Sequence, residues 1–421
     1  METKISNLFT LIIICIVPLI ITPWSIDYYY HPKIMSIYFL CLLMMIFYMV
    51  KIRTIIVEKE NSDYFLLSYI FIILISTLFS VDLILSIQGN SLREEGFAAL
   101  SCYAFIYIIA AKYYKFSRKH IKYLILSSCI IALYGVFQYL GYEIIRPDFI
   151  RKYWHKHSYS TIGNRNFLGS YLVLMLPISI YSYLHSKKNI LLFSSCLLYL
   201  CLLCTITRGA WIGFTASICL LSYYVFKYKI NIKRFAIVAG LFVSITVLFN
   251  IYSGGEIFNR AASIGKDFGD VIKYSSNSAG SHRVFIWKGA IKLIGDRPFL
   301  GSGPDTFGEV FMDKFQKEIK DIYNNSVSFD KAHNEYLQIA VTTGIPSLLL
   351  YIAFIMTIMA KLHKMLEKNK IIVPIYCCIV GYLVQAFFNI SVVSVAPVFW
   401  AILGVGNKFC NSIDFNILEK I

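Results

Sequence analysis

The sequence predicts an all-α polytopic membrane protein, and three observations support this fold class. The chain of 421 residues is 57% hydrophobic, and only 15% of its residues are charged, whereas an ordinary soluble domain has about a quarter. Apolar runs long enough to cross a bilayer recur along the chain, and clusters of Lys and Arg separate them. Because a backbone in lipid must satisfy its own hydrogen bonds, each run is expected to be a helix.

The apolar runs predict about twelve transmembrane spans, at about 20 residues for each crossing of roughly 30 Å of hydrocarbon. They begin near Leu8, Ile34, Tyr64, Gly96, Ile121, Phe167, Ile190, Ala210, Phe235, Glu335, Ile371 and Val392. Spans therefore fill residues 8–251 and 335–406 of a single membrane domain, and a tail covers 407–421. The apolar run near the start imitates a signal peptide, but no small-residue cleavage site follows, so we assign it to the first span.

Positive residues predict the orientation, because short loops rich in Lys and Arg favour the cytoplasm. One set of alternate loops carries Lys51, Arg53 and Lys59; Lys112, Lys115, Arg118, Lys119 and Lys122; Lys187 and Lys188; Lys227, Lys229, Lys233 and Arg234; and Lys361, Lys364, Lys368 and Lys370. We expect these loops and both termini to be cytoplasmic. The net charge of +16 is thus attributed to topology and not to nucleic-acid binding.

Residues 252–334 form the one large loop of the prediction, on the extracytoplasmic side. Within it, residues 281–294 suit a short amphipathic helix lying on the membrane surface. Its apolar positions are Val284, Ile286, Trp287, Ala290, Ile291 and Ile294, and its basic ones are Arg283, Lys288 and Lys292. Residues 298–305 are a turn-rich break, after which we expect a second helix. His333 stands where the chain re-enters the membrane.

Three residues are predicted to converge on the outer face and to supply chemistry there: Arg208, Arg283 and His333. Guanidinium groups bind phosphate through charge-assisted hydrogen bonds, and a neutral imidazole can accept a proton from a hydroxyl. Each residue also has an ordinary alternative. Arg208 can snorkel to lipid phosphates, Arg283 can be a solvated residue of its helix, and His333 can cap the tenth span.

Weaker signals lie elsewhere on the predicted outer face. Arg165, in Gly163-Asn-Arg-Asn166, adds a basic group to the same side, and its alternative is a plain turn before a helix. Asp27 resembles a metal ligand of some lipid-dependent glycosyltransferases, but a lone Asp is more often a solvated loop residue, so we leave it outside the site.

Several site classes lose support from the sequence. It contains no Gly-x-x-x-x-Gly-Lys-Ser/Thr loop, no His-Glu-x-x-His pattern and no Asp-x-Asp element, which disfavours ATP-driven transport, zinc proteolysis and metal-dependent nucleotide-sugar chemistry. All eleven cysteines fall in or beside apolar segments, so a disulfide framework is not expected. We expect no metal and no cofactor.

These residues resemble the superfamily of O-antigen ligases and Wzy-type polysaccharide polymerases. The resemblance is carried by Arg283-Val-Phe-Ile-Trp-Lys-Gly-Ala290, Arg297-Pro-Phe-Leu-Gly-Ser-Gly-Pro-Asp-Thr-Phe307, Ala332-His-Asn-Glu-Tyr-Leu-Gln338, Gly344-Ile-Pro346, Thr207-Arg-Gly-Ala-Trp-Ile-Gly213, Gly163-Asn-Arg-Asn166 and Pro397-Val-Phe-Trp400. It implies a membrane-embedded glycosyltransferase of the GT-C type in a bacterial cell membrane, with an extracytoplasmic active site.

The resemblance also implies the substrate and the residue roles. The donor would be a polyprenyl-diphosphate-linked glycan, used without ATP or metal, in cell-surface polysaccharide biosynthesis. Arg208 and Arg283 would bind the diphosphate with Arg165 as a helper, and His333 would activate the acceptor hydroxyl. A single displacement of this kind predicts inversion at the anomeric carbon.

The acceptor stays open at this point. Ligases deliver glycan to a lipid core, polymerases to another repeat unit, and related transferases to protein hydroxyls. A polysaccharide flippase is the alternative from another class, and it should show two related halves and helices broken near the bilayer midplane. The notable polar residues gather instead at the predicted outer surface, which favours transfer. The expected partners are donor, acceptor and membrane lipids, and no nucleic acid.

Overall fold

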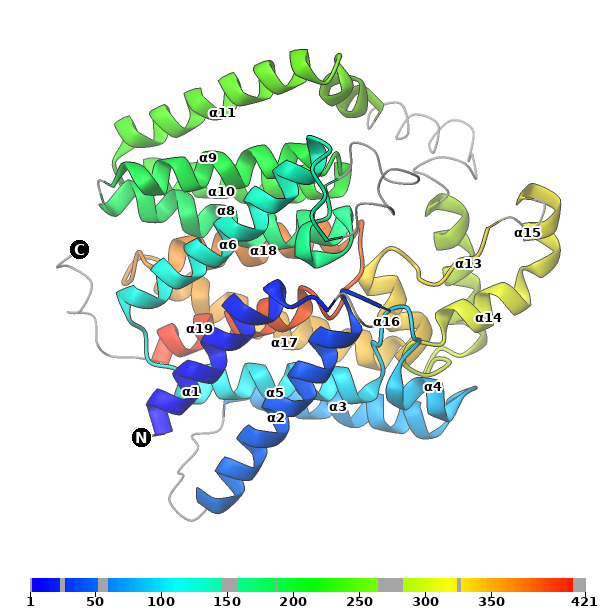
Figure 1. Cartoon of the computed structure of the whole chain (residues 1–421). Coiled ribbons are helices and arrows are strands. Elements are labelled where there is room, and N and C mark those ends of the chain that lie inside the picture. The colour runs from blue at the N-terminus through cyan, green and yellow to red at the C-terminus, as the bar shows by residue number, and fades with distance from the viewer. Residues whose placement is uncertain are drawn as a thin grey trace.

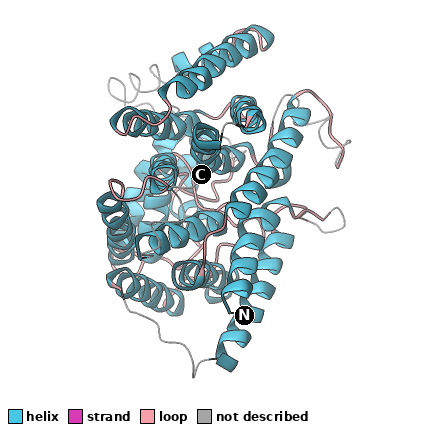
Figure 2. Ribbon diagram, turned by 90° about the vertical axis from the view of Figure 1, so that its left-hand side faces the viewer, coloured by secondary structure: helices cyan, strands magenta, loops and turns pink. Residues whose placement is uncertain are grey.

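The computed structural model describes residues 2–22, 27–51, 60–145, 158–186, 188–263, 283–323 and 327–411. Throughout these residues the chain forms helices and loops, without a strand (Figure 2). The predicted all-helical class is therefore confirmed. The first helices are α1 (Glu2–Leu11), α2 (His31–Lys51), α3 (Asn61–Leu78), α4 (Leu83–Gln88), α5 (Phe97–Tyr113), α6 (Arg118–Tyr139), α8 (Arg165–Ser186), α9 (Asn189–Cys204), α10 (Arg208–Lys227) and α11 (Ile232–Tyr252).

The later helices are shorter until the chain returns to long apolar segments. They are α13 (Arg283–Asp296), α14 (Phe307–Lys314), α15 (Gln316–Tyr323), α16 (Glu335–Thr343), α17 (Ile345–Met365), α18 (Ile372–Ala386) and α19 (Ala396–Asn411). In the described part of the chain, 8 helices are long and apolar enough to cross a membrane, and α5, α9 and α18 are apolar but shorter. The chain is thus polytopic, and the number of about twelve spans remains a prediction.

Helix α8 lies at the centre of the bundle, where 94% of its apolar stretch is buried, against 22% for α11. It packs against α9, α10 and α18, while α11 runs along the upper edge of Figure 1. The first residue of α8 is Arg165, so the most enclosed helix of the molecule fixes the position of this side chain.

The two ends of the bundle differ (Figure 1). Helices α13, α14 and α15 lie at one end, and α1 begins and α19 ends toward the other. At that second end, Glu60 forms an ion pair with Lys361, lies 3.4 Å from Lys112 Nζ and accepts a 2.8 Å hydrogen bond from Asn407 Nδ2. Basic residues of two loops predicted to be cytoplasmic therefore meet at one end of the bundle. The side of the membrane that this end faces remains a prediction.

The predicted span beginning at Glu335 is divided in the structure. Glu335 starts the nine-residue α16, and the long helix α17 begins only at Ile345. Gly344 separates the two with φ of 90°, and a Cβ at this position would lie 2.1 Å from the carbonyl oxygen of Phe299. The turn therefore requires glycine. As a result, α16 packs against α13 as well as α17, and the His333 segment belongs to the loop region.

The amphipathic helix predicted for 281–294 corresponds to α13, but its buried face differs in part from the expected one. Ile286 and Ala290 are buried as predicted. Phe285 and Leu293 are buried as well, whereas Ile291 is 62% exposed. The reason is a small core shared with α14, in which the Phe285 and Phe311 rings meet edge to face at 5.8 Å. Contacts with distant aromatic residues therefore decided which side of α13 faces inward. Whether α13 also touches the membrane surface remains a prediction.

Candidate functional site

A cavity of about 190 Å³ lies where α8, α10 and α13 begin, and we call it the arginine cavity. It is lined by Arg165, Asn166, Ile206, Thr207, Arg208, Gly209, Ala210, Arg260, Arg283, His333, Gln385, Phe388 and Asn389. Every site residue predicted from the sequence is in this set, although the most distant two are 168 positions apart (333 minus 165). The structure thus brings these residues together, and their roles remain predictions.

Close helix packing places Arg208 in the cavity. Gly209 and Gly213 are four residues apart on α10, so they lie on one face of the helix. A Cβ on Gly209 would lie 2.9 Å from Phe388 Cβ, and one on Gly213 would lie 2.7 Å from the Gly381 carbonyl oxygen. These glycines let α10 approach the end of α18 closely, as small residues do between membrane helices. Arg208 is therefore held beside residues that follow it by about 180 positions in the chain.

Three helix N-termini meet at the arginine cavity. Arg165, Arg208 and Arg283 are the first residues of α8, α10 and α13. At α10, the preceding Thr207 forms no side-chain cap with the backbone N–H groups of the first turn. Because helix N-termini carry partial positive charge and unpaired N–H groups, this arrangement favours an anion beyond what the arginine side chains supply.

The arginine cavity concentrates like charge. Among its described lining residues are Arg165, Arg208, Arg260 and Arg283, and none is acidic. The pKa of Arg283 is lowered to about 10, mainly by burial and in addition by the neighbouring charges of Arg208 and Arg165. The guanidinium groups thus repel one another across a partly desolvated space. A ligand with more than one negative charge, such as a diphosphate, would relieve this repulsion.

His333 reaches the same cavity from a constrained segment. Its φ is 49°, an uncommon value for a residue other than glycine. The following Asn334 caps α16 by accepting a 3.1 Å hydrogen bond from the Leu337 backbone N–H. The Trp287 indole donates to the Ala332 carbonyl at 3.1 Å, so α13 directly supports the residue preceding His333. The imidazole is thereby held opposite Arg283, the first residue of α13.

The environment of His333 favours the neutral imidazole. Its pKa is lowered to about 4, mainly by burial and in addition by the charges of Arg283, Arg93 and Lys331, whereas Asp330 opposes the shift. Within the part of the chain that the structure describes, the buried Nδ1 atom has no hydrogen-bond partner. A neutral imidazole can accept a proton from a substrate hydroxyl, which is the property required of a general base.

Asp330, and not Glu335, is the carboxylate that acts on His333. The Asp330 carboxylate pairs with Arg93 Nε at 3.1 Å, and the Arg93 guanidinium lies 5.3 Å from the Phe167 ring centroid. Arg93 therefore links the His333 segment to the first turn of α8. Glu335 is turned elsewhere and accepts a 2.8 Å hydrogen bond from the Tyr351 hydroxyl. Arg93 lies in no motif that would have identified it from the sequence.

Sequence reasoning also missed Arg260, Gln385 and Asn389. Arg260 lies in a helical stretch at 256–263, inside the predicted outer loop, and no motif marks it. Gln385 and Asn389 had a usable signal, because two carboxamides spaced by four residues near the end of an apolar helix are unusual at membrane depth. Both line the arginine cavity with little exposure, at 2% and 3%.

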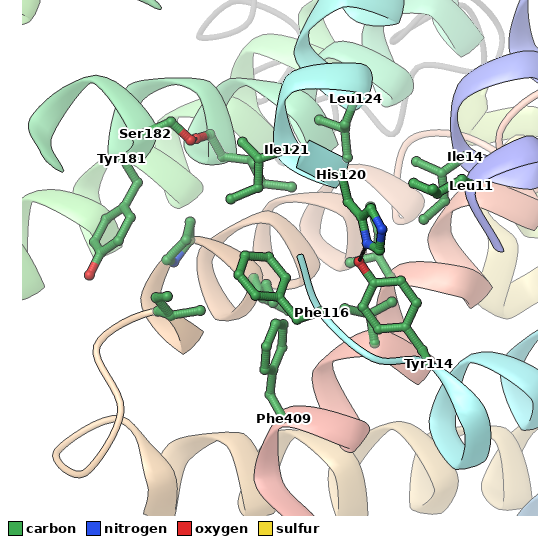
Figure 3. A pocket seen from close by; sticks show the side chains of 16 residues that line it. Leu11, Ile14, Tyr114, Phe116, His120, Ile121, Leu124, Tyr181, Ser182 and Phe409 are labelled. Carbon is green, nitrogen blue, oxygen red and sulfur yellow. Dashed lines mark hydrogen bonds between the residues drawn. The ribbon is translucent and has the colours of Figure 1, made fainter. Parts of the chain in front are cut away.

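A second cavity, at the end of the bundle opposite α13, is apolar and offers no comparable chemistry (Figure 3). Its walls include Leu11, Phe116 and Phe409, and its main polar feature is the 2.8 Å hydrogen bond between the Tyr114 hydroxyl and His120 Nδ1. No arginine or carboxylate is among its described lining residues. The arginine cavity is therefore the better candidate for a polar substrate.

Asp27 has a structural role in this fold. Its carboxylate accepts hydrogen bonds from the backbone N–H groups of Tyr29, Tyr30 and His31 at 2.7 to 3.0 Å, directly before and at the start of α2. Such contacts stabilise a helix N-terminus. Within the described residues, no group of three or more His, Cys, Asp or Glu side chains could hold a metal ion.

Part of the chain is similar to a known protein family. Residues 190–352 match the O-antigen ligase family, so the predicted resemblance to this superfamily is confirmed. The matched segment contains Arg208, Arg283 and His333, whereas Arg165 and the carboxamides of Gln385 and Asn389 lie outside it. An uncharacterized protein of Haemophilus influenzae is 25% identical over 334 residues, which cover 76% of this chain and 77% of the relative.

Proposed function

We propose that this polytopic membrane protein, whose residues 190–352 belong to the O-antigen ligase family, transfers a glycan from a polyprenyl diphosphate to an acceptor hydroxyl. The reaction takes place on the extracytoplasmic face of a bacterial cell membrane and uses neither ATP nor a metal. The observation that carries the proposal is the arginine cavity, in which four arginines and His333 face the same space without an acidic lining residue among those described.

The arginines account for the departure of the diphosphate. As the bond between the anomeric carbon and the phosphate oxygen breaks, negative charge grows on the leaving group. Arg208 and Arg283 are already in place before the reaction, held by helices that begin at these residues. Preorganised charges of this kind stabilise the transition state more than the ground state and need little reorganisation.

His333 accounts for activation of the acceptor. Its imidazole takes the proton of the acceptor hydroxyl while the oxygen attacks the anomeric carbon on the side opposite the diphosphate, so the configuration inverts. A retaining route would need a carboxylate nucleophile at the sugar, and the described lining of the arginine cavity contains none. Since the pKa of His333 is lowered to about 4, transfer should rise with pH through about 4 and level off toward neutral pH.

The test uses purified full-length protein in nanodiscs with a polyprenyl-diphosphate oligosaccharide and a panel of acceptors, without ATP or metal. Wild type should release polyprenyl diphosphate and glycosylate one acceptor, and Arg283→Ala should reduce the rate by about 10²- to 10³-fold. Lys288→Ala is the matched control, because Lys288 lies on the exposed side of the same helix. An equal loss in the control would contradict the assigned role of Arg283.

The productive acceptor separates the alternatives within the superfamily. Transfer to another repeat unit would make the protein a Wzy-type polymerase, and transfer to a lipid core would make it a ligase. Movement of the intact lipid-linked glycan across the bilayer, without release of polyprenyl diphosphate, would instead support a flippase and overturn the transferase proposal.

A further inference from the structure

We propose that Gln385 and Asn389 form a sugar-recognition subsite of the arginine cavity, which accepts hydrogen bonds from hydroxyl or N–H groups of the sugar attached to the diphosphate. This inference rests on the proposed function and deepens it, because it assigns the part of the donor next to the bond that breaks.

The placement of the two carboxamides is the first support. Gln385 lies in the last turn of α18 and Asn389 follows the helix by three residues. Both line the arginine cavity together with His333, Arg208 and Arg283. They face these groups from a different helix, so the cavity has an arginine side and a carboxamide side.

Hydrogen bonds to neighbouring residues fix the orientation of the two carboxamides. Gln385 Nε2 donates to the Asn166 carbonyl at 3.3 Å, and Asn389 Nδ2 donates to the same carbonyl at 3.2 Å and to Ser170 Oγ at 3.0 Å. A carbonyl oxygen can only accept, so the NH₂ group of each carboxamide must point toward Asn166. The oxygen atoms are therefore directed away from this anchor.

Both carboxamide oxygens are left without a partner. Gln385 Oε1 and Asn389 Oδ1 are buried and make no hydrogen bond within the described residues. Buried acceptors of this kind are uncommon, since an unmet hydrogen bond is unfavourable in a desolvated site. Two of them beside one cavity indicate a ligand group that donates hydrogen bonds.

The chemistry of the donor substrate indicates which ligand group donates hydrogen bonds to the two carboxamides. A diphosphate at neutral pH offers only acceptor oxygens, which suit the arginines and are repelled by carboxamide oxygens. The sugar on the other side of the scissile bond carries hydroxyl groups, and an N-acetylated sugar also carries an N–H. The carboxamide side therefore fits the sugar, and the arginine side fits the diphosphate.

The test measures binding to the full-length protein in nanodiscs without any acceptor, so that no turnover is needed. Two probes are compared: a polyprenyl diphosphate, and the same lipid carrying one N-acetylhexosamine. Wild type should bind the sugar-bearing lipid more tightly. Gln385→Met and Asn389→Leu should each reduce this preference by about 3- to 10-fold, the loss expected for one hydrogen bond.

Binding of the sugar-free lipid reports whether each variant is folded, and it should stay at the wild-type level. Asn369→Leu is the matched control, because it replaces a carboxamide by leucine close to the other end of α18. This control should keep the full preference for the sugar-bearing lipid.

The outcomes are distinguishable. An equal loss of both lipids in Gln385→Met and Asn389→Leu would mean that the carboxamides only shape the cavity, and would overturn the subsite. Absence of any preference in wild type would mean that they hold water, with the same consequence. A third outcome is that wild type binds neither lipid, with the same result for Arg283→Ala. This outcome would overturn the proposed function and the subsite together.

Discussion

Two polar cavities lie on either side of the His333 segment, and they treat charge in opposite ways. The arginine cavity gathers four arginines, and no carboxylate is among its described lining residues. The other, which we call the carboxyl cavity, is lined by residues that include Glu95, Asp305, Lys331 and Glu335. There Lys331 forms a buried ion pair with Asp305, and the Tyr103 hydroxyl donates to Glu95 at 2.8 Å.

From this difference we expect the arginine cavity to bind a ligand and the carboxyl cavity to maintain the fold. Asp305 also accepts hydrogen bonds from the backbone N–H groups of Asn90 and Glu95, at 2.6 and 3.1 Å, so it joins three chain segments that are distant in sequence. Opposite charges that pair inside a fold maintain its structure, whereas a cluster of like charges at a cavity is a functional-site signal. The following changes should separate these two roles.

The largest effect is expected for His333→Ala, which removes the proposed general base from the arginine cavity. Transfer should fall by about 10²- to 10⁴-fold, the usual contribution of such a group, whereas the melting temperature should stay close to that of wild type, because the substitution removes only the imidazole and alanine has the same left-handed φ to adopt. Rates in nanodiscs and thermal melts measure both. If the melting temperature instead falls clearly below that of wild type, the loss of transfer would indicate a structural role for His333.

Lys331→Met should have the opposite profile, because it leaves Asp305 buried without its cation. Breaking a buried pair in this way costs about 3 to 5 kcal/mol in the free energy of unfolding. The double variant with Asp305→Asn should regain part of this loss, since asparagine keeps an acceptor for the Asn90 and Glu95 N–H groups without the charge. Equal destabilisation in the single and double variants would contradict the stabilising role of the Lys331–Asp305 ion pair.

Glu95 should make the stability of the carboxyl cavity depend on pH. Burial raises the pKa of Glu95 from 4.5 to about 7, so the folded protein binds a proton that the unfolded chain releases above about 4.5. The stabilisation is complete below this pH and is lost as pH rises through about 7, by an amount on the order of 3 kcal/mol. Thermal melts of Glu95→Gln between pH 4.5 and 8 should show a flatter profile than wild type, and parallel profiles would contradict this.

Arg283→Met should give the smallest change in stability, and it should be a gain. The substitution removes a buried cation that faces Arg208 and Arg165 and keeps much of the side-chain volume. Replacing buried charge by an apolar side chain can stabilise by 1 kcal/mol or slightly more, and we expect about 1 kcal/mol here. The gain should disappear when a polyprenyl diphosphate is added, because only wild type is then stabilised by the ligand.

Local sequence information predicted much of the helical framework, and its failures have a common cause. The apolar run after Glu335 looked like one span because hydropathy does not register the turn at Gly344, which exists to fit the Phe299 carbonyl. The buried face of α13 was misjudged at Ile291 for a similar reason, since Phe311 and other aromatic residues from later segments set the packing. Both errors arise from contacts between parts of the chain that a local window cannot relate.

The residues of the candidate site also fall into two groups, those found through local motifs and those found only through contacts in space. Arg208, Arg283 and His333 were found because each lies in a short motif of its own. Arg93, which pairs with Asp330 beside His333, lies in no motif and becomes visible only through its contact. The orientation of the Gln385 and Asn389 carboxamides is known only from their hydrogen bonds to the Asn166 carbonyl.

By itself, the sequence determined that this chain is helical and polytopic. Each apolar run that enters lipid must satisfy its own backbone hydrogen bonds, and a helix does this. Motifs that are local in the chain also predicted the resemblance to the O-antigen ligase superfamily, and residues 190–352 match that family. Only the tertiary structure decided that Arg165, Arg208, Arg283, His333, Gln385 and Asn389 line one cavity. It also decided that Asp330 pairs with Arg93 and Asp305 with Lys331. Electrostatic environment depends on distance in space and on burial, and neither quantity is a property of a linear sequence.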